Sequence, residues 1–260
     1  MPIITLDRVS KTYPAGAGST EALQDVSLGI DRGEFVSLIG PSGCGKSTLL
    51  RIVGDLVPPS SGTLTVNGKT PEAARLDRDY GIVFQAPVLY DWRTVEANVR
   101  LPLEVMSWPR GEREARVRRL LRLVGLDAFR RHYPWQLSGG MQQRVSLSRA
   151  LALQPPILMM DEPFAALDEI TRESLQDELL RLWGVLETTV LFVTHSISEA
   201  VLLSERVVVM TPHPGRIAEI VEVPFRHPRQ ENLRGSPEFA LLVQDIRRQL
   251  RAKESTQAVA

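Results

Sequence analysis

The sequence contains a single cysteine, Cys44, so an internal disulfide bond is excluded. It has no run of about 18 apolar residues, which a membrane-spanning helix would need, and its start lacks the features of a signal peptide. Lysine plus arginine equals aspartate plus glutamate at 31 each, so no overall basic field favours nucleic acid as a partner. We therefore expect a protein that stays in the cytosol, does not itself span a membrane and has no nucleic-acid partner.

The most informative segment is residues 40–48, whose sequence GPSGCGKST matches a phosphate-binding loop. Apolar residues before and after it indicate the strand and helix that this motif requires. Backbone N–H groups of the loop and the helix N-terminus would surround a polyphosphate. Lys46 would contact the terminal phosphates, which makes it a catalytic candidate, and the Ser47 hydroxyl would bind Mg²⁺. The alternative is a glycine-rich turn without a ligand. The candidate nucleotide-binding residues are Gly40, Ser42, Gly43, Cys44, Gly45, Lys46, Ser47 and Thr48.

Short apolar runs bounded by polar residues or glycine predict buried parallel strands. They lie at residues 35–39, 80–84, 157–160, 190–193 and 207–210. Alternating β-like pieces predict a small antiparallel sheet beside them. These lie at residues 4–6, 26–30 and 62–68. The expected fold is therefore α/β, with a mostly parallel sheet and an antiparallel β subdomain.

The region from about 86 to 156 has a different character and predicts an inserted helical lobe. Within residues 111–125, apolar residues recur at helical spacing and arginines fill the other face. A solvated helix face explains these arginines better than a nucleic-acid patch, because aromatic residues are not interleaved with them. Residues 1–225 are expected to form the main domain. In the remaining part, 226–260, an amphipathic helix begins near residue 236, and the end from 254 onward is expected to fray.

Asp161 and Glu162 follow the apolar run 157–160, at the carboxyl end of a predicted strand, where open α/β sheets place their ligands. Because neighbouring side chains of a strand point in different directions, Asp161 would bind Mg²⁺ while Glu162 orients the attacking water. A solvated pair of acids is the alternative. After a phosphate-binding loop, the pair predicts hydrolysis of the nucleotide.

Residues 137–144, LSGGMQQR, precede a predicted helix and offer the Ser138 hydroxyl and backbone N–H groups at its N-terminus. This segment resembles the signature motif of ABC ATPases, and residues 3 to 225 resemble the ATP-binding subunit of an ABC transporter. The resemblance implies a P-loop NTPase core, ATP and Mg²⁺ as ligands, and phosphate contacts from Ser138, Gly139 and Gly140. Met141 departs from the common motif, which has Gln there. A thioether at this position should leave ATP binding intact.

Further positions fit the same family in the same order. The resemblance implies that Tyr13 stacks on adenine and that Gln85 contacts Mg²⁺ or the attacking water. It also implies that Asp168 communicates across a dimer and that His195 is a switch histidine with a catalytic role. Each of three residues has a simpler alternative. Tyr13 could be an ordinary sheet tyrosine, Gln85 a polar residue at a strand end and His195 a hydrogen-bonded core histidine.

In this family the signature motif of one protomer closes over ATP bound to another, so a homodimer is expected. The chain would lie at the cytoplasmic face of the cell membrane and drive separate permease subunits. The segment 87–92 offers apolar and aromatic residues for docking a permease helix, although Tyr90 and Trp92 could instead pack in a local core. An extracytoplasmic solute-binding protein would act through the permease.

Two stretches, 92–104 and 210–223, resemble the ATP-binding subunits of nitrate, sulfonate and taurine importers. The expected activity is therefore ATP hydrolysis coupled to uptake of a small solute. A soluble ABC ATPase acting on DNA or ribosomes, or the ATPase subunit of an exporter, are the alternatives. The cargo itself is not encoded in this chain, because substrate choice lies with the binding protein and the permease.

Overall fold

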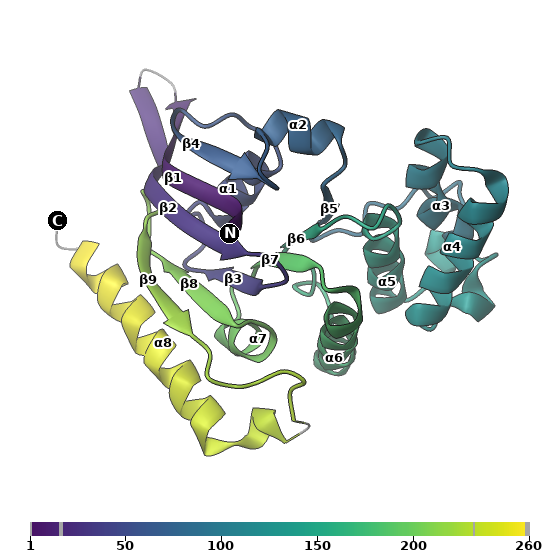
Figure 1. The fold of residues 1–260 in the computed structure, drawn as a ribbon. Coiled ribbons are helices and arrows are strands. Elements are labelled where there is room, and N and C mark those ends of the chain that lie inside the picture. Colours follow the sequence, from purple (N-terminus) through teal and green to yellow (C-terminus); the bar gives the residue numbers. More distant parts are fainter. Residues whose placement is uncertain (1, 16–17, 231, 258–260) are drawn as a thin grey trace. The chain divides into compact units, whose positions relative to one another are not determined.

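The chain divides into two units: residues 1–79 together with 188–260 form the first, and residues 80–187 form the second. The computed structural model describes residues 2–15, 18–230 and 232–257 (Figure 1). The region 86–156, expected to be a helical lobe, falls within the second unit.

An antiparallel sheet in the first unit has β1 (Pro2–Ala15) between β2 (Gly18–Asp31) and β4 (Ser61–Val66). Ile4 lies opposite Ile30 on one side and Val66 on the other. All three side chains are fully buried, because alternate residues of paired strands share one face. The short helix α2 (Pro71–Leu76) follows and is capped by the Thr70 side chain.

The first unit also contains a mostly parallel sheet. The central strand β3 (Phe35–Ile39) pairs in parallel with β7 (Thr189–Val193) and with β8 (Arg206–Met210). Every residue of β3 and β7 is buried, which explains why both appear in the sequence as continuous apolar runs. The edge strand β9 (Ile217–Glu222) pairs antiparallel to β8 and is half exposed, so it lacks such a run.

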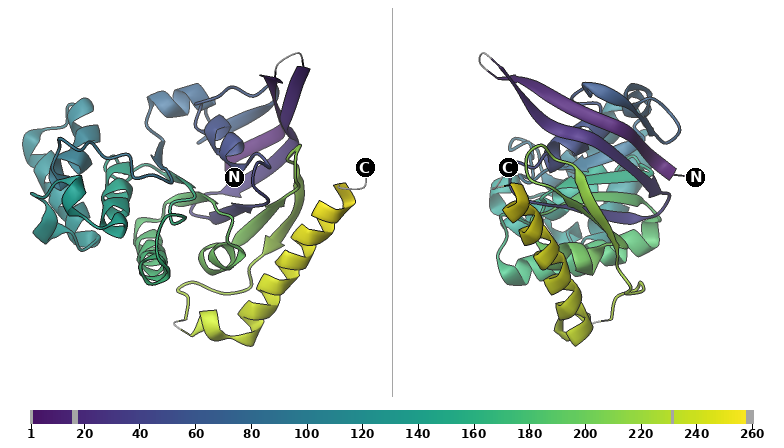
Figure 2. Two further views of the ribbon diagram at one scale, coloured as in Figure 1. Left: turned by 180° about the vertical axis from the view of Figure 1, so that it is seen from behind. Right: turned by 90° about the vertical axis from the view of Figure 1, so that its left-hand side faces the viewer.

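Three helices accompany this sheet: α1 (Lys46–Val53), α7 (Ile197–Leu203) and α8 (Pro237–Gln257). Helix α8 packs against α7 and β8 (Figure 2). Its residues Phe239 and Ile246 are buried. It continues to Gln257, so the fraying expected from residue 254 was wrong for residues 254–257. This segment has no glycine or proline that would end the helix, and Glu254 and Gln257 are good helix formers. Residues 258–260 lie outside the described residues.

The second unit combines two parallel strands with four helices. Strand β5 (Tyr80–Val83) pairs with β6 (Ile157–Asp161). The helices are α3 (Val95–Val105), α4 (Arg110–Leu123), α5 (Gly139–Ala150) and α6 (Glu169–Leu186). In α4 the residues Val117, Leu120 and Leu121 are buried, as their spacing predicted. Short 3-10 turns occupy Asp127–Phe129 and Pro134–Gln136 here and Leu233–Gly235 in the first unit.

Parallel strand pairs, a separate antiparallel sheet and a helix-rich segment together confirm the predicted α/β fold class. Within the described ranges, no helix combines the length and the apolar character needed to cross a membrane.

Candidate nucleotide-binding site

The phosphate-binding loop connects β3 to α1 in the first unit, as predicted. Gly45 caps the N-terminus of α1 with φ +93°, and Gly43 has φ +78°. A Cβ atom on Gly45 would lie 2.8 Å from the Ala22 carbonyl oxygen, so only glycine fits there. The loop therefore has the left-handed turns and the helix N-terminus that suit a bound phosphate.

Lys46 is 5% exposed and is held by its own loop. Its Nζ atom donates to the carbonyl oxygens of Gly40 at 2.8 Å and Pro41 at 2.9 Å. It also lies 3.7 Å from the Cys44 sulfur. To bind a phosphate oxygen, the ammonium group would exchange these carbonyl contacts for stronger charge-assisted ones.

His195 follows β7 and lies at the same sheet edge as the loop. Val193 is in register with Leu38, and the Thr194 N–H donates to the Leu38 carbonyl at 3.2 Å. Gly40 and His195 each come two residues after one of these paired positions, so both follow the carboxyl ends of adjacent parallel strands. His195 is exposed, which contradicts the alternative of a core histidine.

The segment before His195 is fixed by buried polar contacts. The Thr194 hydroxyl donates to Glu199 Oε2 at 2.6 Å and accepts from the Ser196 N–H at 3.0 Å. Ser196 in turn caps α7 by accepting from the Glu199 N–H. These bonds hold the backbone on both sides of His195 while its own side chain faces solvent.

Tyr13 lies near the end of β1, opposite Thr20 of β2. Its ring is half-buried, and the Lys11 ammonium lies 5.0 Å from the ring centroid. The Lys11 Nζ atom also donates to the Pro58 carbonyl at 2.7 Å, which fixes this cation over the ring.

Gly215 is a residue of this site that the sequence reasoning missed. Its N–H donates to the Ala22 carbonyl at 3.0 Å, and its own carbonyl accepts from the Gln24 N–H at 3.0 Å. A Cβ atom at this position would lie 1.9 Å from the Cys44 carbonyl oxygen. The backbone of Gly215 therefore packs directly on the phosphate-binding loop. A Pro-Gly pair, which usually indicates only a turn, was the available signal.

In the second unit, Gln85 and Glu162 also follow matched positions of two adjacent parallel strands, as Gly40 and His195 do in the first. Val83 of β5 is in register with Met160 of β6. Gln85 and Glu162 each follow two residues later, so they share one edge of this strand pair. Gln85 is exposed, and the preceding Phe84 carbonyl accepts from Gln143 Nε2 at 3.2 Å.

Asp161 and Glu162 are both half-buried at the end of β6. Glu162 has φ +47°, an uncommon conformation for a residue with a side chain. Its carbonyl accepts from the Ala165 N–H at 3.2 Å, so the chain turns directly after the acid pair. The acid pair therefore lies at the point where the chain leaves β6.

The segment resembling a signature motif begins α5. Ser138 is the N-cap, and its hydroxyl accepts from the Met141 N–H at 3.3 Å. Ser138 and Gly139 are exposed, whereas Gly140 is buried. A Cβ atom on Gly140 would lie 2.4 Å from Thr171 Cγ2, so this glycine permits close packing of α5 on α6.

Asp168 caps α6 by accepting from the Thr171 N–H at 3.0 Å. This backbone hydrogen bond holds the pKa of the exposed Asp168 carboxyl below its usual value. Thr171 thus contacts both Asp168 and the Gly140 position, and no local sequence pattern indicated this link.

The proposed Mg²⁺ ligands Ser47, Gln85 and Asp161 are oxygen donors of the kind this ion prefers. Among the described residues, no group of three or more His, Cys, Asp or Glu is placed to hold a metal ion. Such a donor set fits an ion that is shared with substrate phosphates rather than one enclosed by protein ligands.

Comparisons with known proteins identify the family of the chain. A family model described as ABC transporter matches residues 23–165, more than half of the chain. An uncharacterised ABC transporter ATP-binding protein of Methanocaldococcus jannaschii is 46% identical over 226 residues, covering 87% of this chain and 84% of that protein. The taurine import ATP-binding protein TauB of Rhizobium johnstonii is 43% identical over 264 residues, covering 99% and 100%.

A solved structure of the ATP-binding cassette MJ0796, dimeric and bound to ADP and Pi after hydrolysis, is similar at a TM-score of 0.75. It is 38% identical and matches 86% of this chain and 100% of that one. The chain therefore belongs to the ABC transporter family. This membership confirms the predicted ATPase activity and ATP as the nucleotide. The relatives named for taurine import confirm the predicted branch.

We predict that Gly215→Ala weakens ATP binding by about tenfold or more, because the new methyl group must displace the Cys44 carbonyl and with it the loop. Calorimetric titration with ATP measures the effect. Gly111→Ala is the control, because a Cβ atom there meets nothing within 4 Å. Equal ATP affinity of the two variants would contradict the role of Gly215.

Cys44 should react slowly with thiol reagents in the native protein. Burial raises the pKa of its thiol above the usual range despite the nearby Lys46, so little reactive thiolate forms at neutral pH. We expect N-ethylmaleimide to label the native chain at least about tenfold more slowly than the urea-unfolded chain. Mass spectrometry over time gives both rates, and similar rates would contradict the prediction.

Proposed function

We propose that the chain is the ATP-hydrolysing subunit of an importer for a small solute of the sulfonate, taurine or nitrate type. The observation that carries the proposal is the strand register. It places His195 at the sheet edge of the phosphate-binding loop in one unit, and Glu162 at the edge of Gln85 in the other. The full-length similarity to a taurine import ATP-binding protein supports the substrate class.

In this proposal, residues 40–48 hold the ATP phosphates through backbone N–H groups and the N-terminus of α1. Lys46 leaves the carbonyls of Gly40 and Pro41 to contact the terminal phosphates. Tyr13 stacks on the base from the end of β1, with its other face near Lys11. Stacking on an aromatic ring discriminates weakly between bases, so some tolerance of GTP is expected.

Glu162 orients the attacking water and accepts its proton, assisted by Gln85 and by His195. Its place at the end of β6, where the chain turns directly after the acid pair, supports this role. Ser47, Gln85 and Asp161 would hold Mg²⁺, which when bound neutralises charge on the phosphate oxygens.

The working unit is a homodimer with two composite sites. Ser138 and Gly139 are exposed at the N-terminus of α5, where they suit contact with ATP on a second copy. Gly140 holds α5 against Thr171, and Asp168 begins the neighbouring helix, so movement of one motif would reach the other. The related MJ0796 cassette is dimeric. Closure depends on contacts to the terminal phosphate, and hydrolysis removes them.

A permease subunit is proposed to dock on residues 87–92. Trp92 is 73% exposed and Val88 60%, so these side chains do not pack in a local core. The rings of Tyr90 and Trp92 lie 4.9 Å apart and form one aromatic surface. Such a surface suits a short helix of an apolar partner.

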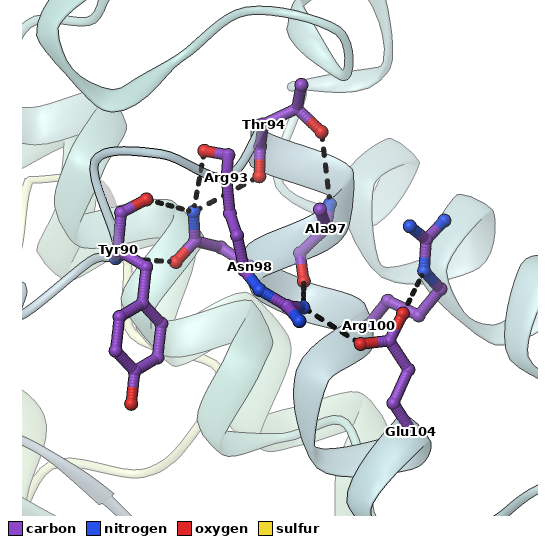
Figure 3. A network of polar contacts seen from close by, with 7 residues as sticks. All are labelled: Tyr90, Arg93, Thr94, Ala97, Asn98, Arg100 and Glu104. Carbon is purple, nitrogen blue, oxygen red and sulfur yellow. Dashed lines mark hydrogen bonds and ion pairs between the residues drawn. The ribbon is translucent and has the colours of Figure 1, made fainter.

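One buried side chain, that of Asn98, bonds to the backbone of residues 90, 93 and 94 beside the proposed docking surface (Figure 3). Asn98 accepts from the Tyr90 N–H at 2.8 Å and donates to the carbonyls of Tyr90, Arg93 and Thr94 at 3.0–3.1 Å. Arg149 donates to the Val88 carbonyl at 2.8 Å from α5. Motion of the helices would therefore be transmitted to the loop.

Through this permease the chain would lie at the cytoplasmic face of the membrane. A solute-binding protein outside the cytoplasm would deliver the cargo. No observation favours the alternatives of a DNA- or ribosome-associated ATPase or of an exporter subunit.

Glu162→Gln should lower ATP hydrolysis by about 10²-fold or more while ATP still binds, because the amide cannot accept a proton from water. Gel filtration with MgATP should then show a trapped dimer. Glu169→Gln is the control, because Glu169 is exposed in the first turn of α6. Unchanged steady-state hydrolysis in Glu162→Gln would overturn the assignment.

Trp92→Ala should reduce recovery of a polytopic permease in affinity purification from native membranes by about tenfold or more, since an aromatic anchor is lost. ATP binding should not change. Trp135→Ala, which removes another exposed tryptophan (64%), is the matched control. Mass spectrometry identifies the captured proteins. Equal permease recovery with both variants would place the docking surface elsewhere.

A further inference from the structure

An open cavity of about 840 Å³ lies within the second unit, where α4, α5 and α6 meet. Four arginines line it: Arg119 and Arg122 from α4, Arg144 from α5 and Arg181 from α6. Glu178 is its one acidic lining residue. The whole chain has zero formal net charge, so this excess of positive charge is a local feature.

Two of these guanidinium groups are fixed in the cavity wall. Arg144 Nε lies 2.9 Å from Glu178 Oε2, and its Nη2 donates to the Ser174 hydroxyl at 3.4 Å. Arg181 Nη2 donates to the Leu123 carbonyl at 2.5 Å. These contacts neutralise one positive charge and orient the two side chains without filling the cavity.

The other two arginines are largely uncompensated. Within the part of the chain that the structure describes, Arg119 makes no hydrogen bond or ion pair, and Arg122 only donates from Nε to the Arg118 carbonyl at 3.3 Å. Both side chains are exposed at the cavity. Four like charges facing one opposite charge repel one another, and an anion would relieve this repulsion.

The other face of the same helix shows that α4 can balance its charges. Arg110 pairs with Glu114 at 3.0 Å, and Arg118 lies 4.0 Å from the same carboxylate. Arg119 and Arg122, by contrast, have no acid three or four positions away on α4. A general need for a solvated basic helix therefore does not explain them.

Guanidinium groups are planar donors that match the oxygens of a phosphate, often in pairs. The cavity volume lies within the range of about 300–1,000 Å³ typical of small-molecule sites. We propose that this cavity binds a small multivalent phosphate, either free or as the head group of an anionic lipid. None of the lining residues is among the candidate nucleotide-binding residues, and the proposal does not depend on the proposed transport function.

Calorimetric titration of the full chain with tripolyphosphate tests the proposal, with the phosphate-binding loop first filled by MgADP. We expect one tripolyphosphate per chain, with an affinity that falls as salt rises. Arg119→Gln combined with Arg122→Gln should weaken binding by about tenfold or more. Glu178→Gln should strengthen tripolyphosphate binding, because it removes the negative charge that opposes the ligand. If the arginines had only a structural role, this substitution would not raise the affinity.

The matched control is Arg110→Gln combined with Arg118→Gln, which removes the same charge from the same helix outside the cavity. This variant should bind tripolyphosphate as the unaltered chain does. Equal weakening in both double variants, or no binding by the unaltered chain, overturns the proposal. ATP affinity should be unchanged in all variants, so failure here is distinct from failure of the ATPase assignment.

Sedimentation with phosphatidylcholine vesicles, with and without phosphatidic acid, distinguishes the two sources of phosphate. Binding to phosphatidic acid that requires Arg119 and Arg122 supports a lipid head group. Binding of tripolyphosphate without such sedimentation supports a free ligand.

Discussion

Direct packing of backbone on backbone at the phosphate-binding loop is the constraint on which the rest of the nucleotide site depends. Gly45 turns the chain into α1 at a place where any side chain would meet the Ala22 carbonyl. Gly215 approaches the Cys44 carbonyl so closely that no Cβ atom fits. Two segments far apart in the sequence, at Ala22 and at Gly215, thereby fix one loop, and the loop holds its amide groups in place before a ligand arrives.

Within each unit, parallel strand register determines which polar residues share a sheet edge. In both units, a candidate residue follows two positions after a pair of matched strand residues: His195 beside the loop, and Glu162 beside Gln85. Buried strands cannot carry such polar groups along their length, so these groups gather where the strands end. In each unit, the same sheet geometry that buries the apolar runs therefore also brings polar residues together at one sheet edge.

The chain has zero formal net charge, but its positively charged side chains have different partners in different places. Lys46 is buried and held by carbonyl oxygens, in contacts that a phosphate can replace. On one face of α4 the arginines pair with Glu114, whereas on the other face Arg119 and Arg122 meet further arginines from α5 and α6. Burial and pairing, rather than net charge, decide which cations are available for ligands.

Local sequence patterns were sufficient to predict the phosphate-binding loop, the main parallel strands, the acid pair at 161–162 and the amphipathic face of α4. Each depends on residues that are close in the chain, so spacing alone reveals it. The half-exposed strand β9 was missed because it has no continuous apolar run, and the extent of α8 was underestimated because capping signals are weak there. The contacts of Gly215 and Thr171 and the arginine-lined cavity are determined only by the tertiary structure. Their roles come from contacts between segments far apart in the sequence, and such contacts leave no periodic pattern along the chain.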